Sequence, residues 1–153
     1  MTTSSRRLIN LSILLALAST LPILSFLFPE SAAAVSSRGD PANVAGNWDY
    51  RTRSNCGTVE GVGAVSFVWD AETSTYRENG YVYWSDSGST IRWWGSDRYD
   101  ASNRTLIGRV SNTLGDTVDH TWELEGPGPD RAVVRWNQTN GCRGEGIATR
   151  ASN

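Results

Sequence analysis

The chain has 153 residues, a length typical of one domain. All 14 of its basic residues are arginine, and 16 acidic residues give it a net charge of −2. Because such a chain lacks the basic field that a phosphate backbone requires, we expect no binding to nucleic acid. Its charge content and its 10% of aromatic residues argue against an intrinsically disordered chain.

Residues 1–34 have the three parts of an export signal peptide. Arg6-Arg7 provides a positive start, an apolar run spans residues 11–28, and Ala32-Ala33-Ala34 offers a small-residue cleavage site. The alternative is an uncleaved membrane anchor, because the apolar run is nearly long enough to span a bilayer. Pro22 within the run and the alanines after it favour cleavage. We therefore expect a secreted or periplasmic mature protein that is not attached to a membrane.

The rest of the chain predicts strands rather than helices. Residues 35–43 are polar and contain Pro41, which indicates a flexible lead-in. Residues 44–150 form one domain of short alternating stretches separated by Gly, Asn, Asp and Pro, and residues 151–153 are a tail. The eight predicted strands comprise residues 47–53, 62–69, 75–84, 89–99, 103–111, 117–125, 131–138 and 142–150.

Alternation within these strands indicates which side chains face the interior. In the sixth predicted strand, Val118, His120, Trp122 and Leu124 share one face, while the other face is polar. One apolar and one polar face are typical of a single sheet closed on itself. Eight short strands at even spacing with tight links therefore predict an all-β, antiparallel up-and-down barrel, with an open β-sandwich as the alternative.

Two strands are harder to assign. In the fourth predicted strand the neighbours Trp93 and Trp94 must point to opposite faces, and we place Trp93 inward and Trp94 outward. In the third we place Trp84 inward, although Tyr81 and Tyr83 form an alternative inward set. An outward Trp94 would be an exposed ring beside Arg92, which indicates a contact surface.

The two cysteines, Cys56 and Cys142, predict one disulfide, because an exported chain with an even number of cysteines usually pairs them. Chain entropy gives a loop of this length a stabilisation of roughly 4.5 kcal/mol. In an eight-stranded barrel the first and last strands are neighbours, so this bridge would close the seam. A metal site is the alternative reading, but these cysteines and His120 do not form a dense ligand cluster. We predict no metal and no cofactor.

The first predicted strand begins with Gly46-Asn47-Trp48, which resembles the G-x-W signature of the lipocalin-like calycin group. The resemblance implies an eight-stranded barrel with a ligand cavity. It also implies that Arg150, at the end of the last strand, packs across Trp48, a cation–π contact of about 1 kcal/mol. The opening residues, followed by Cys56, are also similar to small bacterial periplasmic inhibitors of metalloproteases.

The interior residues allow a functional and a structural interpretation. His120 could donate to a polar ligand or act as a pH switch, or it could be a hydrogen-bonded interior histidine. The tryptophans could form an aromatic cavity, or simply fill a barrel with few Leu and Ile residues. The acidic pairs, such as Asp119 with Glu123, are typical of solvated strand faces.

The sequence thus predicts an exported, non-enzymatic barrel that binds a small, partly apolar or aromatic ligand. We expect no enzyme, because a nucleophile elbow is absent and one histidine would have to serve any triad. The alternative is a protein-interaction module, such as an enzyme inhibitor, that acts through a rim or through Arg92 and Trp94. The predicted ligand-binding residues are Phe67, Trp69, Trp84, Trp93, His120, Trp122 and Trp136.

Overall fold

The computed structural model describes residues 39–57 and 60–152, and the predicted signal peptide lies outside them. Their strands match the predicted ones to within two residues at each end. Within the described ranges, no helix is long and apolar enough to cross a membrane. The strands are β1 (Gly46–Ser54), β2 (Glu60–Asp70), β3 (Thr75–Trp84), β4 (Ser89–Asp100), β5 (Thr105–Asn112), β6 (Thr117–Glu125), β7 (Arg131–Gln138) and β8 (Arg143–Arg150).

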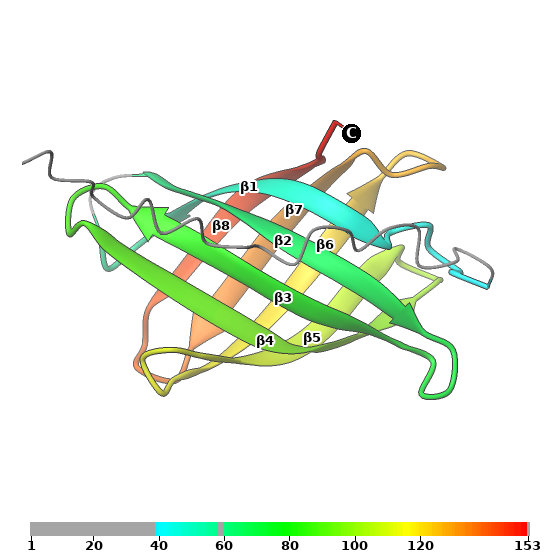
Figure 1. Cartoon of the computed structure of the whole chain (residues 1–153), viewed down its shortest axis with the longest axis horizontal. Helices are drawn as coiled ribbons and strands as arrows, with labels where there is room; N and C mark the ends of the chain where they lie inside the picture. The colour runs from blue at the N-terminus through cyan, green and yellow to red at the C-terminus, as the bar shows by residue number, and fades with distance from the viewer. Residues whose placement is uncertain (1–38, 58–59, 153) are drawn as a thin grey trace, which may run out of the picture.

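The strands form one closed barrel (Figure 1). Each strand pairs antiparallel with the next one in the chain, and β1 pairs with β8, where Trp48 lies opposite Arg150 and Ser54 opposite Gly144. Pairing of the first and last strands confirms the up-and-down barrel and rules out the open sandwich. A closed sheet leaves no unpaired edge along the seam.

A disulfide joins Cys56 to Cys142 at this seam, with their Cα atoms 5.6 Å apart. Cys56 follows β1 and Cys142 precedes β8, so the bridge links the two strands where they leave the sheet. The neighbouring backbone is tied as well, because the Asn55 amide donates to the Arg143 carbonyl at 2.9 Å. The bridge therefore holds one end of the seam.

At the other end of the seam, Arg150 lies over Trp48. The guanidinium carbon is 4.7 Å from the ring centroid, and the guanidinium donates to the carbonyls of Ala45 at 3.1 Å and Pro129 at 3.2 Å. Gly46 has φ +129°, a backbone conformation that favours glycine, and a Cβ there would touch the guanidinium. The glycine, tryptophan and arginine thus close this end of the barrel together.

Residues 40–43, which belong to the predicted lead-in, pack against this closed end. Ala42 and Val44 are buried. The Asp40 carboxylate accepts hydrogen bonds from the Ala42 and Ala45 amides and from the Tyr76 hydroxyl. An aspartate that binds its own following amides forms a compact turn, and small apolar side chains then fit into the end of the barrel.

Strand alternation divides the side chains as expected. Trp93 points inward, whereas Trp94 is 50% exposed on the outer surface. In β3, Val82 is buried and Trp84 packs against the interior, whereas Tyr83 is exposed, which settles the inward set of that strand. The interior forms two clusters, a larger one in the closed half of the barrel and a smaller one around Val110, Val118 and Trp136 in the other half.

Candidate functional site

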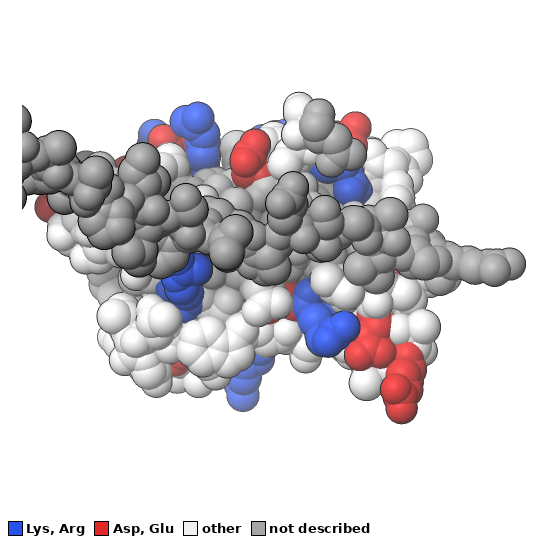
Figure 2. Space-filling view, viewed as in Figure 1, with Lys and Arg blue, Asp and Glu red and all other residues white. Residues whose placement is uncertain are grey.

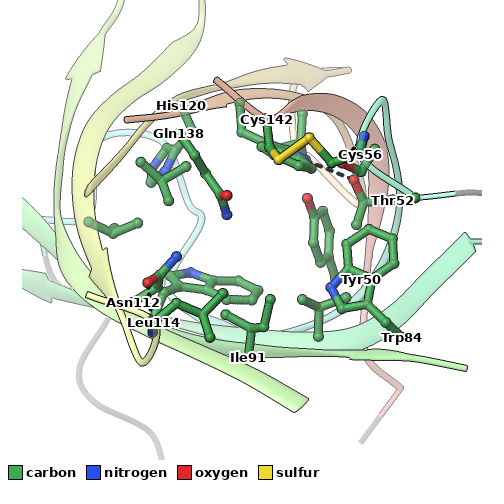
Figure 3. Close-up of a pocket in the computed structure, with 18 of the residues that line it drawn as sticks. Tyr50, Thr52, Cys56, Trp84, Ile91, Asn112, Leu114, His120, Gln138 and Cys142 are labelled. Carbon is green, nitrogen blue, oxygen red and sulfur yellow. Dashed lines mark hydrogen bonds between the residues drawn. A yellow bond between two sulfur atoms is a disulfide. The ribbon is translucent and has the colours of Figure 1, made fainter. Parts of the chain in front are cut away.

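The half of the barrel that holds the disulfide contains a cavity of about 280 Å³ (Figure 3). It opens among the β1–β2, β3–β4, β5–β6 and β7–β8 loops, which contribute Gly57, Ser87, Leu114 and Asn140 to its rim. Below the rim the wall is mostly apolar. The side chains that form the wall and floor include Tyr50, Thr52, Glu78, Val82, Trp84, Ile91, Trp93, Val110, Val118, His120, Trp122, Val134 and Trp136.

Five of the seven predicted ligand-binding residues line this cavity, namely Trp84, Trp93, His120, Trp122 and Trp136. The structure places the other two, Phe67 and Trp69, in the closed half. Phe67 packs against Trp122 with ring centroids 5.1 Å apart, and Trp69 packs against Tyr76 at 4.9 Å. Both rings belong to the interior, as alternation predicts, but they lie near the end of β2 that is farthest from the opening.

Inward-facing glycines make room for the larger side chains of the cavity. A Cβ at Gly80 would lie 2.2 Å from the Trp93 ring, and one at Gly144 would lie 2.5 Å from the Trp136 ring. A Cβ at Gly108 would lie 1.6 Å from the Asp97 carboxylate and 2.8 Å from the His120 ring. Because glycine has no side chain, a large side chain on the neighbouring strand can lie directly over the glycine backbone.

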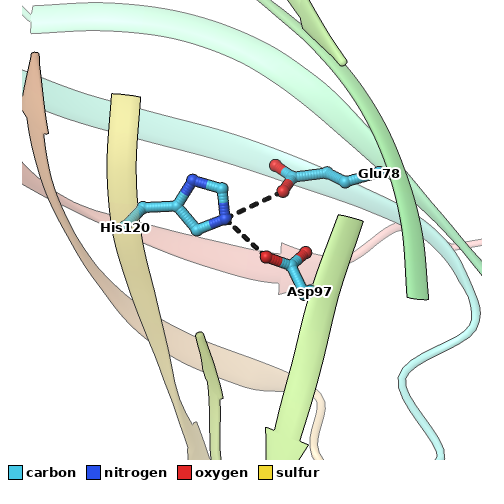
Figure 4. Close-up of side chains that lie close together, drawn as sticks. All are labelled: Glu78, Asp97 and His120. Atoms are coloured by element: carbon cyan, nitrogen blue, oxygen red, sulfur yellow. Dashed lines mark hydrogen bonds and ion pairs between the residues drawn. The ribbon is translucent and has the colours of Figure 1, made fainter. Parts of the chain in front are cut away.

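His120 lies at the floor of the cavity, in a cluster with two carboxylates that the sequence analysis did not identify (Figure 4). Its Nε2 atom is 2.7 Å from Asp97 Oδ1 and 3.0 Å from Glu78 Oε2. The Trp93 indole N–H donates to the other oxygen of Glu78 at 2.6 Å. Both acidic side chains are 0% exposed. Buried charges of this kind are stable only when they are paired, and these three groups pair with one another.

The charges of the cluster depend on each other. Burial disfavours a charged imidazole, but the Glu78 charge and the hydrogen bonds to both carboxylates outweigh it and raise the pKa of His120 to about 10. Burial and then the Glu78 charge raise the pKa of Asp97 to about 7. Burial acts to raise the pKa of Glu78 as well, but the His120 charge and hydrogen bonds lower it overall. Near neutral pH the cluster holds one imidazolium, one carboxylate and a titrating Asp97.

The same three side chains are the group in the described part of the chain that could share a metal ion, since their ligand atoms lie within 4.8 Å of one another. The 2.7 Å distance from His120 Nε2 to Asp97 Oδ1 is that of a charge-assisted hydrogen bond, and the 3.0 Å distance to Glu78 Oε2 is that of an ion pair. Because the pKa of His120 is raised to about 10, its charged imidazole is a proton donor toward these carboxyl groups near neutral pH.

Other polar groups point toward the cavity. The Asn112 side-chain oxygen accepts from the amides of Leu114 at 2.9 Å and Asp116 at 3.0 Å, which fixes its orientation. Its amide nitrogen is buried without a partner among the described residues, and Figure 3 shows it beside the opening. The Trp136 indole N–H donates to the Thr52 hydroxyl at 2.8 Å. The cavity thus combines apolar walls with a few oriented polar groups, as ligand sites do.

The sequence contained a signal for Glu78 and Asp97. Glu78 has the same parity as Trp84 in its strand, and Asp97 has the same parity as Trp93, so inward placement of the tryptophans also placed the acids inward. Their partner His120 lies on a third strand. Alternation could have flagged both acids, but only the closed barrel shows that they meet.

No protein-family model and no curated protein matches the chain. Solved structures do match it. One is a redesigned beta barrel, with a TM-score of 0.61, 16% sequence identity, and coverage of 72% of this chain and 94% of that one. Another is the redesigned beta barrel mFAP0 bound to DFHBI, with a TM-score of 0.60, 17% identity, and coverage of 71% and 99%.

A third similar structure is a fluorescence-activating beta barrel designed de novo, with a TM-score of 0.57, 21% identity, and coverage of 70% of this chain and 93% of that one. This chain shares their fold. At such low sequence identity, the similarity shows only the shared architecture, an eight-stranded antiparallel closed barrel. It does not assign the chain to a family.

Proposed function

We propose that this chain is an exported, non-enzymatic barrel that binds a small, partly apolar or aromatic ligand in its open half. The observation that carries the proposal is the cavity of about 280 Å³ walled by aromatic rings. An apolar cavity of roughly 150 Å³ accommodates benzene, so this one has the size for a ligand of one or two rings. Two similar barrels, mFAP0 and mFAP1, are bound to DFHBI in their structures, which supports a ligand in this architecture.

The proposal of a calycin relationship goes beyond the shared barrel and rests on three residues. Gly46 has the positive φ, Trp48 is buried, and Arg150 lies over its ring, which is the arrangement that the G-x-W resemblance implies. In that group the tryptophan and arginine close the floor beneath a ligand cavity. Here the cavity likewise opens at the opposite end of the barrel.

The proposal of export rests on the sequence of residues 1–34 and on the disulfide. A bond between Cys56 and Cys142 forms and persists in an oxidising compartment such as the periplasm or the extracellular space. The test is N-terminal sequencing of the protein recovered outside the cytoplasm. A start at Val35, or within a few residues of it, supports export with cleavage, whereas an intact start at Met1 overturns it.

The proposal of a non-enzymatic barrel rests on how the titratable groups of the cavity are used. The His120 Nε2 atom, which a general base would need free, is held between two buried carboxylates. The pKa of His120 is raised to about 10, so the imidazole is charged and cannot accept a proton near neutral pH. His120 is therefore better suited to a structural role in the floor than to the role of a general base.

Titration with a neutral, environment-sensitive probe such as prodan tests ligand binding. We expect one site per barrel and quenching of tryptophan emission, because several indoles line the cavity. Trp122→Ala removes a ring of the floor, and Trp84→Ala removes one at the rim with less risk to folding. Each should weaken binding far more than Trp94→Ala, whose ring is on the outer surface. Absence of probe binding, or equal effects of all three variants, overturns the proposal.

A second candidate function, a protein-interaction module, is favoured by the outer face of β2–β4. Tyr83 and Trp94 are 41% and 50% exposed on this face. Arg92 is also exposed and lies opposite Tyr81 in the pairing of β3 with β4. Tyr, Trp and Arg are enriched in protein interfaces. If Trp94→Ser abolishes inhibition of a protease by the purified protein while prodan binding persists, this surface carries the function. Inhibition that survives Trp94→Ser overturns this candidate.

A further inference from the structure

The cavity lacks the positive side chains that an anionic ligand would need. Among the described residues that line it, the charged ones are Glu78, Asp86 and His120, and none is an arginine. Arginines of the described strands instead lie outside, where Arg109 pairs with Asp119 across the outer face. Figure 2 shows arginine and acidic side chains interspersed on the outer surface. The chain thus keeps guanidinium groups away from the cavity.

The floor of the cavity holds two acidic side chains but only one basic group. One imidazole serves two fully buried carboxylates, and its single Nε2–H lies between Asp97 and Glu78. The second Asp97 oxygen is buried without a hydrogen-bond partner among the described residues. A buried negative charge without a full set of partners is unfavourable, and a positive charge brought close to it compensates that cost.

Electron-rich aromatic rings line the walls of the cavity. Trp84, Trp93, Trp122 and Trp136 line the cavity together with Tyr50. Indole is the best cation–π partner among the side chains, and aromatic cages of this type recognise ammonium groups. The Trp93 N–H donates to the negatively charged Glu78, which polarises the ring and makes its face more negative.

From these observations we infer that the cavity takes a small organic cation, an amine or quaternary ammonium group carried on an apolar or aromatic body, and discriminates against carboxylates and phosphates. This inference rests on the proposed function and names the chemistry of its ligand. The ammonium group lies among the indole faces above Glu78, and the apolar body fills the space beside Val82, Val110 and Val118.

The inference implies a coupling to protons. Asp97 on β4 faces Glu78 from β3 and His120 from β6, and Tyr50 from β1 borders the same floor. A cation in the cavity favours the ionised form of Asp97 and lowers its pKa from about 7. Binding therefore releases a proton, and the affinity for a cation rises as the pH increases from 6 to 8. A neutral ligand lacks this dependence.

Three probes with the same ring test the inference by calorimetry at low salt: 2-phenylethylamine, 2-phenylethanol and phenylacetate. The amine is positive and phenylacetate negative throughout pH 6–8, while the alcohol is neutral. We expect the amine to bind at least tenfold more tightly than the alcohol, phenylacetate to bind most weakly, and the amine alone to gain several-fold in affinity between pH 6 and pH 8.

Four single substitutions locate the effect. Trp84→Leu keeps an apolar side chain at the rim but removes the ring face, so it should weaken binding of the amine more than that of the alcohol. Asp97→Asn should abolish the pH dependence of amine binding. Should Asp97→Asn fail to fold, Asp86→Asn at the rim, which removes a negative charge outside the buried cluster, should still lower the preference for the amine. Trp94→Leu is the matched control on the outer surface and should leave all three affinities unchanged.

The outcomes separate this inference from the proposed function. Equal affinities for the amine and the alcohol, or a tighter affinity for phenylacetate, overturn the organic-cation inference, while a bound alcohol keeps the proposal of an apolar ligand site. A preference for the amine that Trp84→Leu and Asp86→Asn leave unchanged also overturns the inference. Absence of binding by all three probes and by prodan contradicts the inference and the proposed function together.

Discussion

The closed and open halves of this barrel are built from the same strands but are filled differently. In the closed half, inward rings such as Phe67 and Tyr76 pack with residues 42–44 of the preceding segment and are buried. In the open half, inward glycines alternate with large rings, and an ion-pair cluster forms the floor of a cavity. Alternation in a strand therefore specifies which side chains are interior, whereas the end segments and glycines decide whether that interior is solid.

The largest expected difference between the halves is the cost of removing an apolar side chain. Leu106 is fully buried in the closed half, so Leu106→Ala should lower the free energy of unfolding by about 3–5 kcal/mol. Ile91, of similar size, borders the cavity of the open half, so Ile91→Ala should cost about 1 kcal/mol because its neighbours already face empty space. Urea denaturation of both variants measures the difference. Equal losses would show that the open half is packed as densely as the closed one.

The buried cluster should make stability depend on pH. The folded state holds a proton on Asp97 up to about pH 7, well above its ordinary value of 3.8, so the stability from this group is present at low pH and lost as the pH rises toward 7. The contribution of His120 is complete below its ordinary value of 6.5 and is lost as the pH rises through about 10. The contribution of Glu78, whose pKa is lowered, is complete above its ordinary value of 4.5 and is lost as the pH falls below that value.

The Asp97 and His120 shifts predict that the barrel is more stable at pH 5 than at pH 8. Urea denaturation at the two values measures it. Asp97→Asn is the informative variant. It should remove the decrease in the free energy of unfolding between pH 4 and pH 7 and leave the decrease at higher pH that is due to His120. A stability that rises from pH 5 to pH 8 in the unmodified protein would contradict the assigned charges.

A smaller effect is expected at the closed end of the seam. Arg150→Ala removes the contact with the Trp48 ring and hydrogen bonds to the Ala45 and Pro129 carbonyls, so it should cost about 1–2 kcal/mol. Arg143→Ala, on the exposed start of the same strand, is the control and should change the denaturation midpoint little. If both variants unfold at the midpoint of the unmodified protein, the arginine does not close the barrel.

The contrast between the halves also shows what the sequence can and cannot predict. Turn residues and period-two alternation placed the strands and the faces of Trp93 and Trp94, because both features are local. They could not place Phe67 and Trp84 at different depths, since depth depends on the tilt and register of every strand in the closed sheet.

The buried cluster shows a second limit. An acid on an inward face is unfavourable by itself, and Glu78 becomes acceptable only because His120 and Asp97 reach it from two other strands. That compensation is a property of the tertiary structure. The packed segment at residues 40–43 is similar, because its polar sequence describes a loop, whereas contact with Tyr76 orders it.

Filling the cavity of the open half tests whether one small ligand binds there. Val118 points into it from β6, and Ile107 points outward from β5 and is exposed. We predict that Val118→Trp abolishes prodan binding while the protein keeps its cooperative unfolding transition, and that Ile107→Trp binds the probe as the unmodified protein does. Unchanged binding by a folded Val118→Trp would show that the ligand binds outside this cavity.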